Sequence, residues 1–224
     1  MAIYTWPADL PPTTAAFYLE HNAAIAASPL TRAMQVMNRP GVRWVCRMEF
    51  RNRGAATAAR IETLLARLEG PVHEVLLFDF RRPLPRGTAA ALAATADFTD
   101  DTAFTDGTGF AEYASAPTLS AVAAANADAL HTEGWATSET VLLAGDYVCV
   151  AGRLHMVIDD VISDSGGDAL LRVRPRLRAA VGTGARLRVI RPPARFRLTE
   201  NAVPNEAEAG PLTSYSLSFV EAIP

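Results

Sequence analysis

The sequence contains no lysine, so all 21 of its cationic residues are arginine. Against 24 acidic residues they leave a formal net charge of -3. This balance excludes a general polyanion-binding protein, because non-specific nucleic-acid affinity depends on many cationic contacts to phosphates. The arginine bias favours a GC-rich genome over a requirement for bidentate, stackable cations at interfaces, although the second interpretation stays open.

Cysteine is also scarce, with only Cys46 and Cys149, each inside an apolar, strand-like run. Two thiols cannot build a tetrahedral zinc site, and the four histidines are not at ligand spacing from them. We therefore expect buried, reduced thiols and no disulfide framework. The sequence lacks a signal-peptide pattern and any apolar run near the ~20 residues of a membrane span. We expect a chain made in the cytosol and kept or assembled there.

The first part of the chain predicts a strand, a helix and a second strand. Residues 42–51 alternate and direct four side chains to one face: Trp44, Cys46, Met48 and Phe50. The next segment has helical spacing, with an apolar stripe of Ala58, Ile61, Leu64, Leu65 and Leu68 and a stop at Gly70-Pro71. Residues 73–80 then read as a strand. The helix is expected to cover one face of a sheet.

Residues 88–135 are rich in Ala, Thr, Asp and Gly and contain few large apolar side chains. We predict a mostly exposed excursion with a turn at Asp106-Gly107. A short helix could form near 119–130, although its propensity is not supported by an apolar stripe. It contains an acidic and aromatic cluster: Asp97, Asp100, Asp101, Asp106, Phe98, Phe104 and Phe110. A solvated loop whose phenylalanines fold back on their own domain is favoured over a loop that docks into a partner.

From residue 141 onward, short β-rich runs follow one another and are separated by Gly, Pro, Asp or Asn. This spacing predicts a sandwich or a small barrel. The last run, 212–223, alternates cleanly, with Tyr215, Leu217 and Phe219 on one side. We expect this strand to close a sheet begun elsewhere in the chain.

Residues 164–167 read Asp-Ser-Gly-Gly, the run that surrounds the nucleophile of chymotrypsin-like serine proteases. A serine nucleophile needs an imidazole base that a carboxylate orients. His155 lies on the preceding strand, but its surroundings resemble no catalytic histidine segment. Because Asp, Ser and Gly each favour turns, we predict that Ser165 lies at a hairpin tip, and we predict no catalytic residue and no enzyme.

Two further groups of charged residues are candidates for binding. Asp159, Asp160, Asp164 and Asp168 lack the register of a calcium loop, so only a weak, adventitious cation site stays open. We predict no metal and no cofactor site.

Nine arginines form the other group: Arg172, Arg174, Arg176, Arg178, Arg186, Arg188, Arg191, Arg195 and Arg197. The first four alternate along one side of an extended segment and could touch nucleic acid, acidic residues of a neighbouring subunit, or solvent.

The order of these segments resembles the distal tail proteins of siphovirus-like tailed bacteriophages. The similarity runs through SPLTRAMQV (28–36), GVRWVCRMEF (41–50), EVLLFDF (74–80), residues 134–178 and YSLSFVEAI (215–223). Its most specific part is LLAGDYVCVAGRLHMV (142–157) followed by RVRPRLR (172–178). None of these motifs is catalytic, so the resemblance implies no active site.

The resemblance implies a mainly β virion structural protein with two domains. Residues 1–85 and 195–224 would form a β-sandwich with one flanking helix, and residues 86–194 an inserted small β-barrel similar to an oligonucleotide/oligosaccharide-binding (OB) fold. Copies would assemble in the host cytoplasm into a ring, a homohexamer, within the baseplate or tail tip. This ring would join the tail tube to the hub and fibres and let the genome pass without specific binding.

Two alternatives remain beside the ring. The first is a tail-tube or tail-terminator protein, which would polymerise or cap tubes. The second, from another class, is a carbohydrate-binding module acting through the inserted barrel. That function needs exposed aromatic side chains, and residues 141–195 contain only Tyr147.

Overall fold

The computed structural model describes residues 1–93, 116–207 and 212–223, which are mainly β with one α-helix. The chain divides into two compact units: unit 1 is Met1–Leu77 with Arg195–Pro224, and unit 2 is Phe78–Ala194. The first boundary therefore falls before residue 78, whereas the sequence placed it after residue 85. Side chains explain the difference, because Arg82 and Arg86 both donate hydrogen bonds to the Ala144–Asp146 segment of unit 2.

Unit 1 is built on a seven-stranded sheet. Its strands are β1 (Ile3–Thr5), β2 (Thr14–Glu20), β5 (Arg43–Arg53), β6 (Glu74–Leu77), β15 (Ala194–Leu198), β16 (Asn205–Ala207) and β17 (Thr213–Glu221). The order across the sheet is β1-β6-β15-β17-β5-β2, and β16 pairs with β17. The C-terminal strand therefore lies inside a sheet that early strands begin, as its regular alternation predicts.

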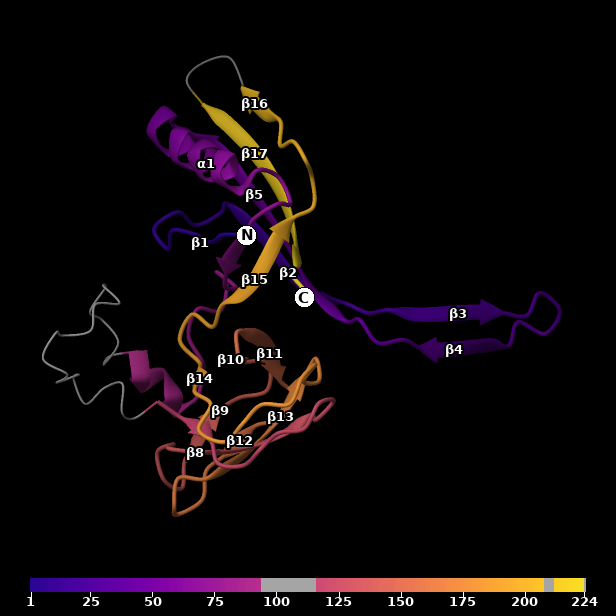
Figure 1. Cartoon of the computed structure of the whole chain (residues 1–224), viewed down its shortest axis with the longest axis vertical. Helices are drawn as coiled ribbons and strands as arrows, with labels where there is room; N and C mark the ends of the chain where they lie inside the picture. Colours follow the sequence, from indigo (N-terminus) through magenta and orange to yellow (C-terminus); the bar gives the residue numbers. More distant parts are fainter. Residues whose placement is uncertain (94–115, 208–211, 224) are drawn as a thin grey trace, which may run out of the picture. The chain divides into compact units, whose positions relative to one another are not determined.

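The core of unit 1 lies on one face of this sheet. The four alternating residues predicted for β5 are all buried, and Tyr215, Leu217 and Phe219 of β17 are buried beside them. Helix α1 (Ala55–Leu68) buries Ala58, Ile61, Leu64 and Leu68, and Leu65 is only partly buried. Figure 1 shows α1 alongside β17 and β5, and the Tyr215 hydroxyl donates to Glu62 Oε1 at 2.7 Å. The helix therefore covers the apolar face of the sheet, as predicted.

A separate two-stranded hairpin is inserted between β2 and β5. It consists of β3 (Ala23–Ala27) and β4 (Met34–Asn38), joined by the turn 28–33, and Figure 1 shows it as an extended ribbon. The ladder is closed at the turn by the Ser28 N–H donating to the Ala33 carbonyl, and at the base by the Arg39 N–H donating to the Asn22 carbonyl. Among the described strands, β3 and β4 pair only with each other.

Unit 2 contains a six-stranded sheet in the order β14-β10-β11-β13-β8-β7. In chain order these strands are β7 (Thr118–Leu119), β8 (Ala129–Glu133), β10 (Tyr147–Val150), β11 (Arg153–Val157), β13 (Ala169–Arg174) and β14 (Leu187–Arg188). A bridge between Thr118 and Arg186 brings the two ends of the sheet together, and the Leu119 N–H donates to the Ala185 carbonyl. The sheet is thus a nearly closed barrel.

Three smaller elements complete unit 2. Strands β9 (Thr140–Leu142) and β12 (Val161–Ile162) pair with each other, and η1 (Thr88–Ala93) is a 3-10 helix. The barrel interior is apolar and includes Leu130, Val148, Val157, Leu171 and Val173. In the described parts of both units, no helix has the length and apolar character to cross a membrane.

The prediction of an exposed excursion over 88–135 is wrong for its last part. Residues 116–135 contribute β7 and β8 to the barrel, and Leu119, Leu130 and Trp135 are buried. The short helix near 119–130 is also wrong, because tertiary pairing with β13 and the segment near β14 overrides helix propensity there. The acidic and aromatic cluster and the turn at Asp106-Gly107 lie outside the described residues.

Candidate functional site

Ser165 lies in an exposed turn, as predicted, but the prediction of a hairpin tip is wrong. The turn joins β12 to β13, and these strands pair with other partners: β12 with β9, and β13 with β8 and β11. Within the described residues, Ser165 makes no side-chain hydrogen bond to a histidine. The arrangement of imidazole and carboxylate that a serine nucleophile requires does not form around it.

Asp164 and Gly167 hold this turn. The Asp164 carboxylate accepts hydrogen bonds from the N–H groups of Asp168 and Gly166, at 2.9 and 2.8 Å, and these bonds lower the pKa of Asp164. Gly167 has a φ of +82°, and a Cβ there would lie 2.6 Å from the Trp135 carbonyl oxygen. The Asp-Ser-Gly-Gly run is therefore explained by backbone geometry.

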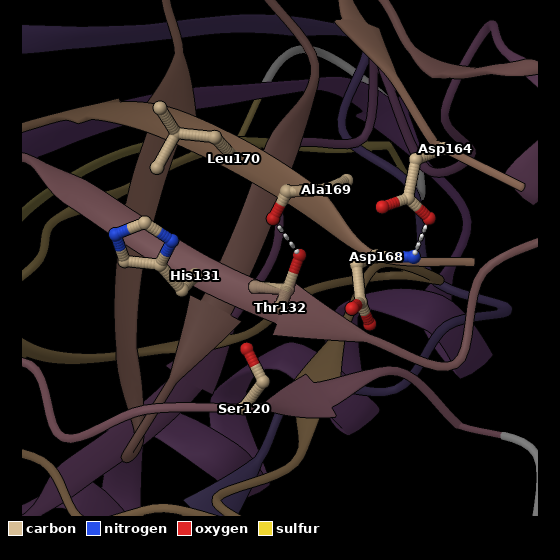
Figure 2. Close-up of a pocket in the computed structure, with 7 residues that line it drawn as sticks. All are labelled: Ser120, His131, Thr132, Asp164, Asp168, Ala169 and Leu170. Atoms are coloured by element: carbon tan, nitrogen blue, oxygen red, sulfur yellow. Dashed lines mark hydrogen bonds between the residues drawn. The ribbon is translucent and has the colours of Figure 1, made fainter. Parts of the chain in front are cut away.

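An open pocket of about 240 Å³ lies beside this turn (Figure 2). Ser120, His131, Thr132, Asp164, Asp168, Ala169 and Leu170 line it. Figure 2 shows His131 and the two aspartates on opposite sides of the Thr132 and Ala169 pair, whose hydrogen bond is 2.8 Å long. The groups that could act on a ligand thus point to different parts of the pocket.

The four aspartates of the candidate cation site do not converge. Asp160 accepts a hydrogen bond from the Ala144 N–H, and Asp159 lies 3.8 Å from Arg172, whereas Asp164 is used within its own turn. No group of three metal-ligating side chains comes together in the described part of the chain. The carboxylates stabilise local backbone and side-chain contacts instead.

His155 and both cysteines are buried in the cores of their units. His155 is 1% exposed, its Nδ1 lies 2.7 Å from the Pro175 carbonyl oxygen, and burial lowers its pKa to about 4. Cys46 and Cys149 are buried thiols outside any disulfide, as predicted, and burial raises the pKa of Cys149 to about 11. A neutral imidazole and a protonated thiol in these positions suit packing rather than proton transfer with solvent.

Three of the four alternating arginines are paired with acidic residues of their own unit. Arg174 and Arg176 lie 2.8 and 3.3 Å from Asp128, and Arg172 lies 3.8 Å from Asp159. The hydrogen bond from Arg174 lowers the pKa of Asp128. These intramolecular ion pairs neutralise part of the positive charge of the arginines, which is then less available to nucleic acid or to a neighbouring subunit.

The nine arginines are also divided between the two units. Arg195 and Arg197 belong to unit 1, where both approach the buried Glu74, at 3.9 and 3.1 Å. The run from Arg172 to Arg197 therefore spans both units of the chain.

The clearest candidate for binding is the β3–β4 hairpin, which the sequence did not single out as a surface. Its large apolar side chains are between 59% and 93% exposed: Ile25, Leu30, Met34, Val36 and Met37. A large exposed apolar area of this kind marks an interaction site in soluble proteins.

Both faces of this hairpin carry large apolar side chains, although the second face also includes Gln35. Directly paired residues point to the same side, so Ile25 with Val36 and Ala27 with Met34 form one face, and Ala24 with Met37 lies on the other. Neither strand contains a charged residue. Natural edge strands usually carry charges or proline that prevent unwanted pairing, and an isolated two-stranded hairpin is marginally stable in water. The hairpin therefore has the properties of a segment that another surface covers.

The apolar residues of this hairpin are visible in the sequence, but they do not follow the periodic spacing that usually identifies a strand or a helix. The large apolar residues of 23–38 follow no period of two and no helical spacing, so they indicate neither a half-buried strand nor an amphipathic helix. Only the pairing of β3 with β4, away from the other sheets, shows that the apolar residues are exposed.

Comparisons with known proteins do not identify the chain. No protein-family model matches it, and no curated protein is significantly similar to it. The functional conclusion therefore rests on the surfaces described above and on the sequence resemblance.

Proposed function

We propose that the protein is a distal tail protein of a siphovirus-like bacteriophage. Its copies form a ring, a hexamer by resemblance, that joins the tail tube to the hub and fibres at the tail tip. In this proposal the sheet of unit 1 belongs to a β-sandwich ring domain, and the barrel of unit 2 is the OB-like insertion. The ring is assembled in the host cytoplasm and leaves a lumen for the genome.

The exposed apolar hairpin β3–β4 is the observation that carries the proposal. A chain that worked alone would gain nothing from a ribbon whose strands are uncharged and which exposes five large apolar side chains to water. A chain that assembles with identical copies uses such a segment as one half of an interface. Where two different patches of each copy meet, the subunits form closed rings if the rotation closes.

The division into two units supports the same proposal. Unit 2 is a continuous segment, Phe78–Ala194, inserted between β6 and β15 of unit 1. Insertion leaves unit 1 with both chain ends and the hairpin, so one unit can form the ring while the other contacts further tail proteins. This separation of roles is what the resemblance implies.

Electron microscopy of the purified full chain tests the ring. We expect closed rings with a central hole in negative stain. Open or stacked tubes would favour the tail-tube alternative, and single particles of the size of one chain would contradict both.

A carbohydrate-binding function through the barrel gains no support. Tyr147, the sole aromatic residue of 141–195, is 5% exposed, and the Arg82 guanidinium lies 5.7 Å from its ring centroid. Sugar-binding platforms need an open aromatic face, which the described barrel residues do not offer.

A serine hydrolase function is tested by Ser165→Ala. Because the turn is held by Asp164 and Gly167, we expect the variant to fold and assemble as the wild type does, with an unfolding free energy within about 0.5 kcal/mol. Loss of an esterase or peptidase activity that the wild type possesses would contradict our proposal.

A further inference from the structure

We infer that Arg82 and Arg86 of unit 2 form a binding site for a phosphate group. Both belong to the segment RRPLPR (81–86), which contacts the loop Ala144–Asp146 of the same unit. The inference is independent of the proposed ring, because it concerns the surface of one unit and a small anion.

The two guanidinium groups meet at Gly145. Arg82 Nη1 donates to the Gly145 carbonyl at 2.9 Å, and Arg86 Nη2 donates to the Ala144 carbonyl. Gly145 has a φ of +91°, and a Cβ at this residue would lie 3.3 Å from Arg86 Nη2 and 3.4 Å from Arg82 Nη1. Because both nitrogens are so close to a single point, the two cationic groups are direct neighbours, and glycine keeps that point free of a side chain.

The two arginines are fixed in place by other groups of unit 2. Asp146 is 3% exposed and accepts hydrogen bonds from the backbone N–H and from Nε of Arg86, at 3.0 and 2.8 Å. The guanidinium of Arg82 lies 5.7 Å from the ring centroid of the buried Tyr147. The two prolines of the segment restrict the backbone between the arginines. A site that is ordered in this way loses little conformational entropy when an anion binds.

Hydrogen-bond donors remain on both guanidinium groups. Within the described residues, Nε and Nη2 of Arg82 and Nη1 of Arg86 donate no hydrogen bond. Both side chains also remain accessible, since that of Arg86 is 54% exposed and Arg82 is exposed as well. One anion can therefore accept hydrogen bonds from both arginines.

The positive charge of the two arginines is only partly neutralised. Arg86 pairs with Asp146 at 2.8 Å, whereas Arg82 forms no ion pair in the described part of the chain. Two guanidinium groups at such close range repel each other. A bound anion would relieve this repulsion and neutralise the remaining charge.

Two further carboxylates belong to this region and do not neutralise Arg82. Asp79 is fully buried and pairs with Arg81 at 2.8 Å. Asp160 accepts a hydrogen bond from the Ala144 N–H at 2.8 Å and forms no ion pair with Arg82 or Arg86 among the described residues.

A tetrahedral phosphate group suits this arrangement better than a carboxylate. A carboxylate presents two oxygens in one plane and is matched by the fork of a single guanidinium. The oxygens of a phosphate group point in several directions, so they can reach two guanidinium groups that different carbonyls hold. Acetate is therefore expected to bind more weakly than phosphate, and equal binding would contradict this choice of ligand.

The unfolding midpoint of the full chain, measured against ligand concentration, tests the site. Inorganic phosphate represents a free or terminal phosphate group, diethyl phosphate represents the diester link of a polymer, and sodium chloride keeps the ionic strength constant. We expect at least one of them to raise the midpoint with a dissociation constant on the order of 1 mM, weak because the site is open to solvent. The ligand that binds more tightly identifies the kind of source. A midpoint that neither ligand changes would contradict the inference.

Arg82→Gln separates binding at this site from the general stabilisation of proteins by phosphate. Because Arg82 has no ion pair within the described residues, its replacement leaves no buried charge unpaired, and we expect the variant to fold and to bind phosphate about tenfold more weakly. Arg172→Gln is the matched control, since it removes the same charge from another exposed position of unit 2, and it should respond as the wild type does. An equal response of both variants would contradict the site.

Modification of the wild type with phenylglyoxal provides a second test that does not depend on a variant. The reagent reacts with accessible guanidinium groups, and peptide mass spectrometry measures each arginine separately. We expect phosphate to protect Arg82 and Arg86 while Arg172 reacts at an unchanged rate. Equal protection of all three arginines, or protection of none, would overturn the inference.

Discussion

At the scale of single residues, the Asp-Ser-Gly-Gly run shows how context decides a motif. Four residues match a protease signature, but the Asp164 carboxylate accepts hydrogen bonds from two backbone N–H groups of the turn. Gly167 has a left-handed φ, which glycine adopts without strain, and a Cβ at this position would come too close to the Trp135 carbonyl oxygen. The side chain of Ser165 is the least constrained part of the turn.

Gly167→Ala is expected to destabilise unit 2 by about 1–3 kcal/mol, the cost of a residue held in a disfavoured backbone conformation. The added Cβ would also force the Trp135 carbonyl to move. Chemical unfolding measures the change. Gly182→Ala is the matched control, because a Cβ there meets no atom within 4 Å, and an equal loss in both variants would contradict this account.

His155 gives the protein a pH-dependent stability. Its pKa falls to about 4 in the folded chain because it is buried, and the nearby Arg153 and Arg178 act in the same direction. In the unfolded chain the pKa is about 6.5. Between these values the unfolded state binds a proton that the folded state does not, so stability falls as the pH drops from about 6.5 to 4, by about 3 kcal/mol in total.

Measuring the unfolding free energy against pH tests this assignment. The wild type should lose stability over that window, and His155→Gln should show a smaller slope, by up to one proton. Carboxylates contribute as well, since the lowered pKa values of Asp128 and Asp164 add stability that is lost at still lower pH. An unchanged slope between pH 6.5 and 4.5 in the variant would rule out His155 as the source.

At the scale of elements, sequence reasoning works where one periodicity extends over many residues. Strand β5, helix α1 and strand β17 span 11, 14 and 9 residues, and each has one buried face. Strands β7 and β8 escape prediction because they are short and contain one large apolar residue each, Leu119 and Leu130. Their conformation depends on pairing with distant segments, which local pattern does not encode.

The exposed hairpin and the strand pairing on either side of Ser165 escape prediction for different reasons. Strands β3 and β4 lack alternation because both of their faces carry large apolar side chains, so no buried side can be identified from the sequence. The Ser165 turn is recognisable from its residues, but the pairing of its flanking strands is not. The residues of a turn determine its local backbone geometry. The partners of the flanking strands are determined by contacts with segments that are distant in sequence.

Helix α1 begins without a side-chain cap. Gly54 is the N-cap residue, has an extended conformation and forms no side-chain hydrogen bond there, and a Cβ at this position meets no atom within 4 Å. Aspartate would accept a bond from a free N–H of the first turn and interact favourably with the helix dipole. Gly54→Asp should therefore raise the unfolding free energy by about 0.5 kcal/mol in chemical denaturation. A decrease would contradict this capping assignment.

At the scale of the whole molecule, the sequence indicates the class of structure but not the assembly. A mainly β chain with one helix follows from its patterns, and the discontinuous unit 1 follows from the pairing of β17 with β5. Interfaces are harder to foresee, because an exposed apolar side chain and a buried one look alike in sequence. Only the exposure of residues such as Ile25 and Val36 distinguishes them.

The molar mass of the purified full chain, measured by multi-angle light scattering at tens of micromolar, tests the central claim most directly. The proposed ring predicts one discrete species with a mass six times that of the 24.0 kDa chain, stable on moderate dilution. A single species with the mass of one chain would contradict it.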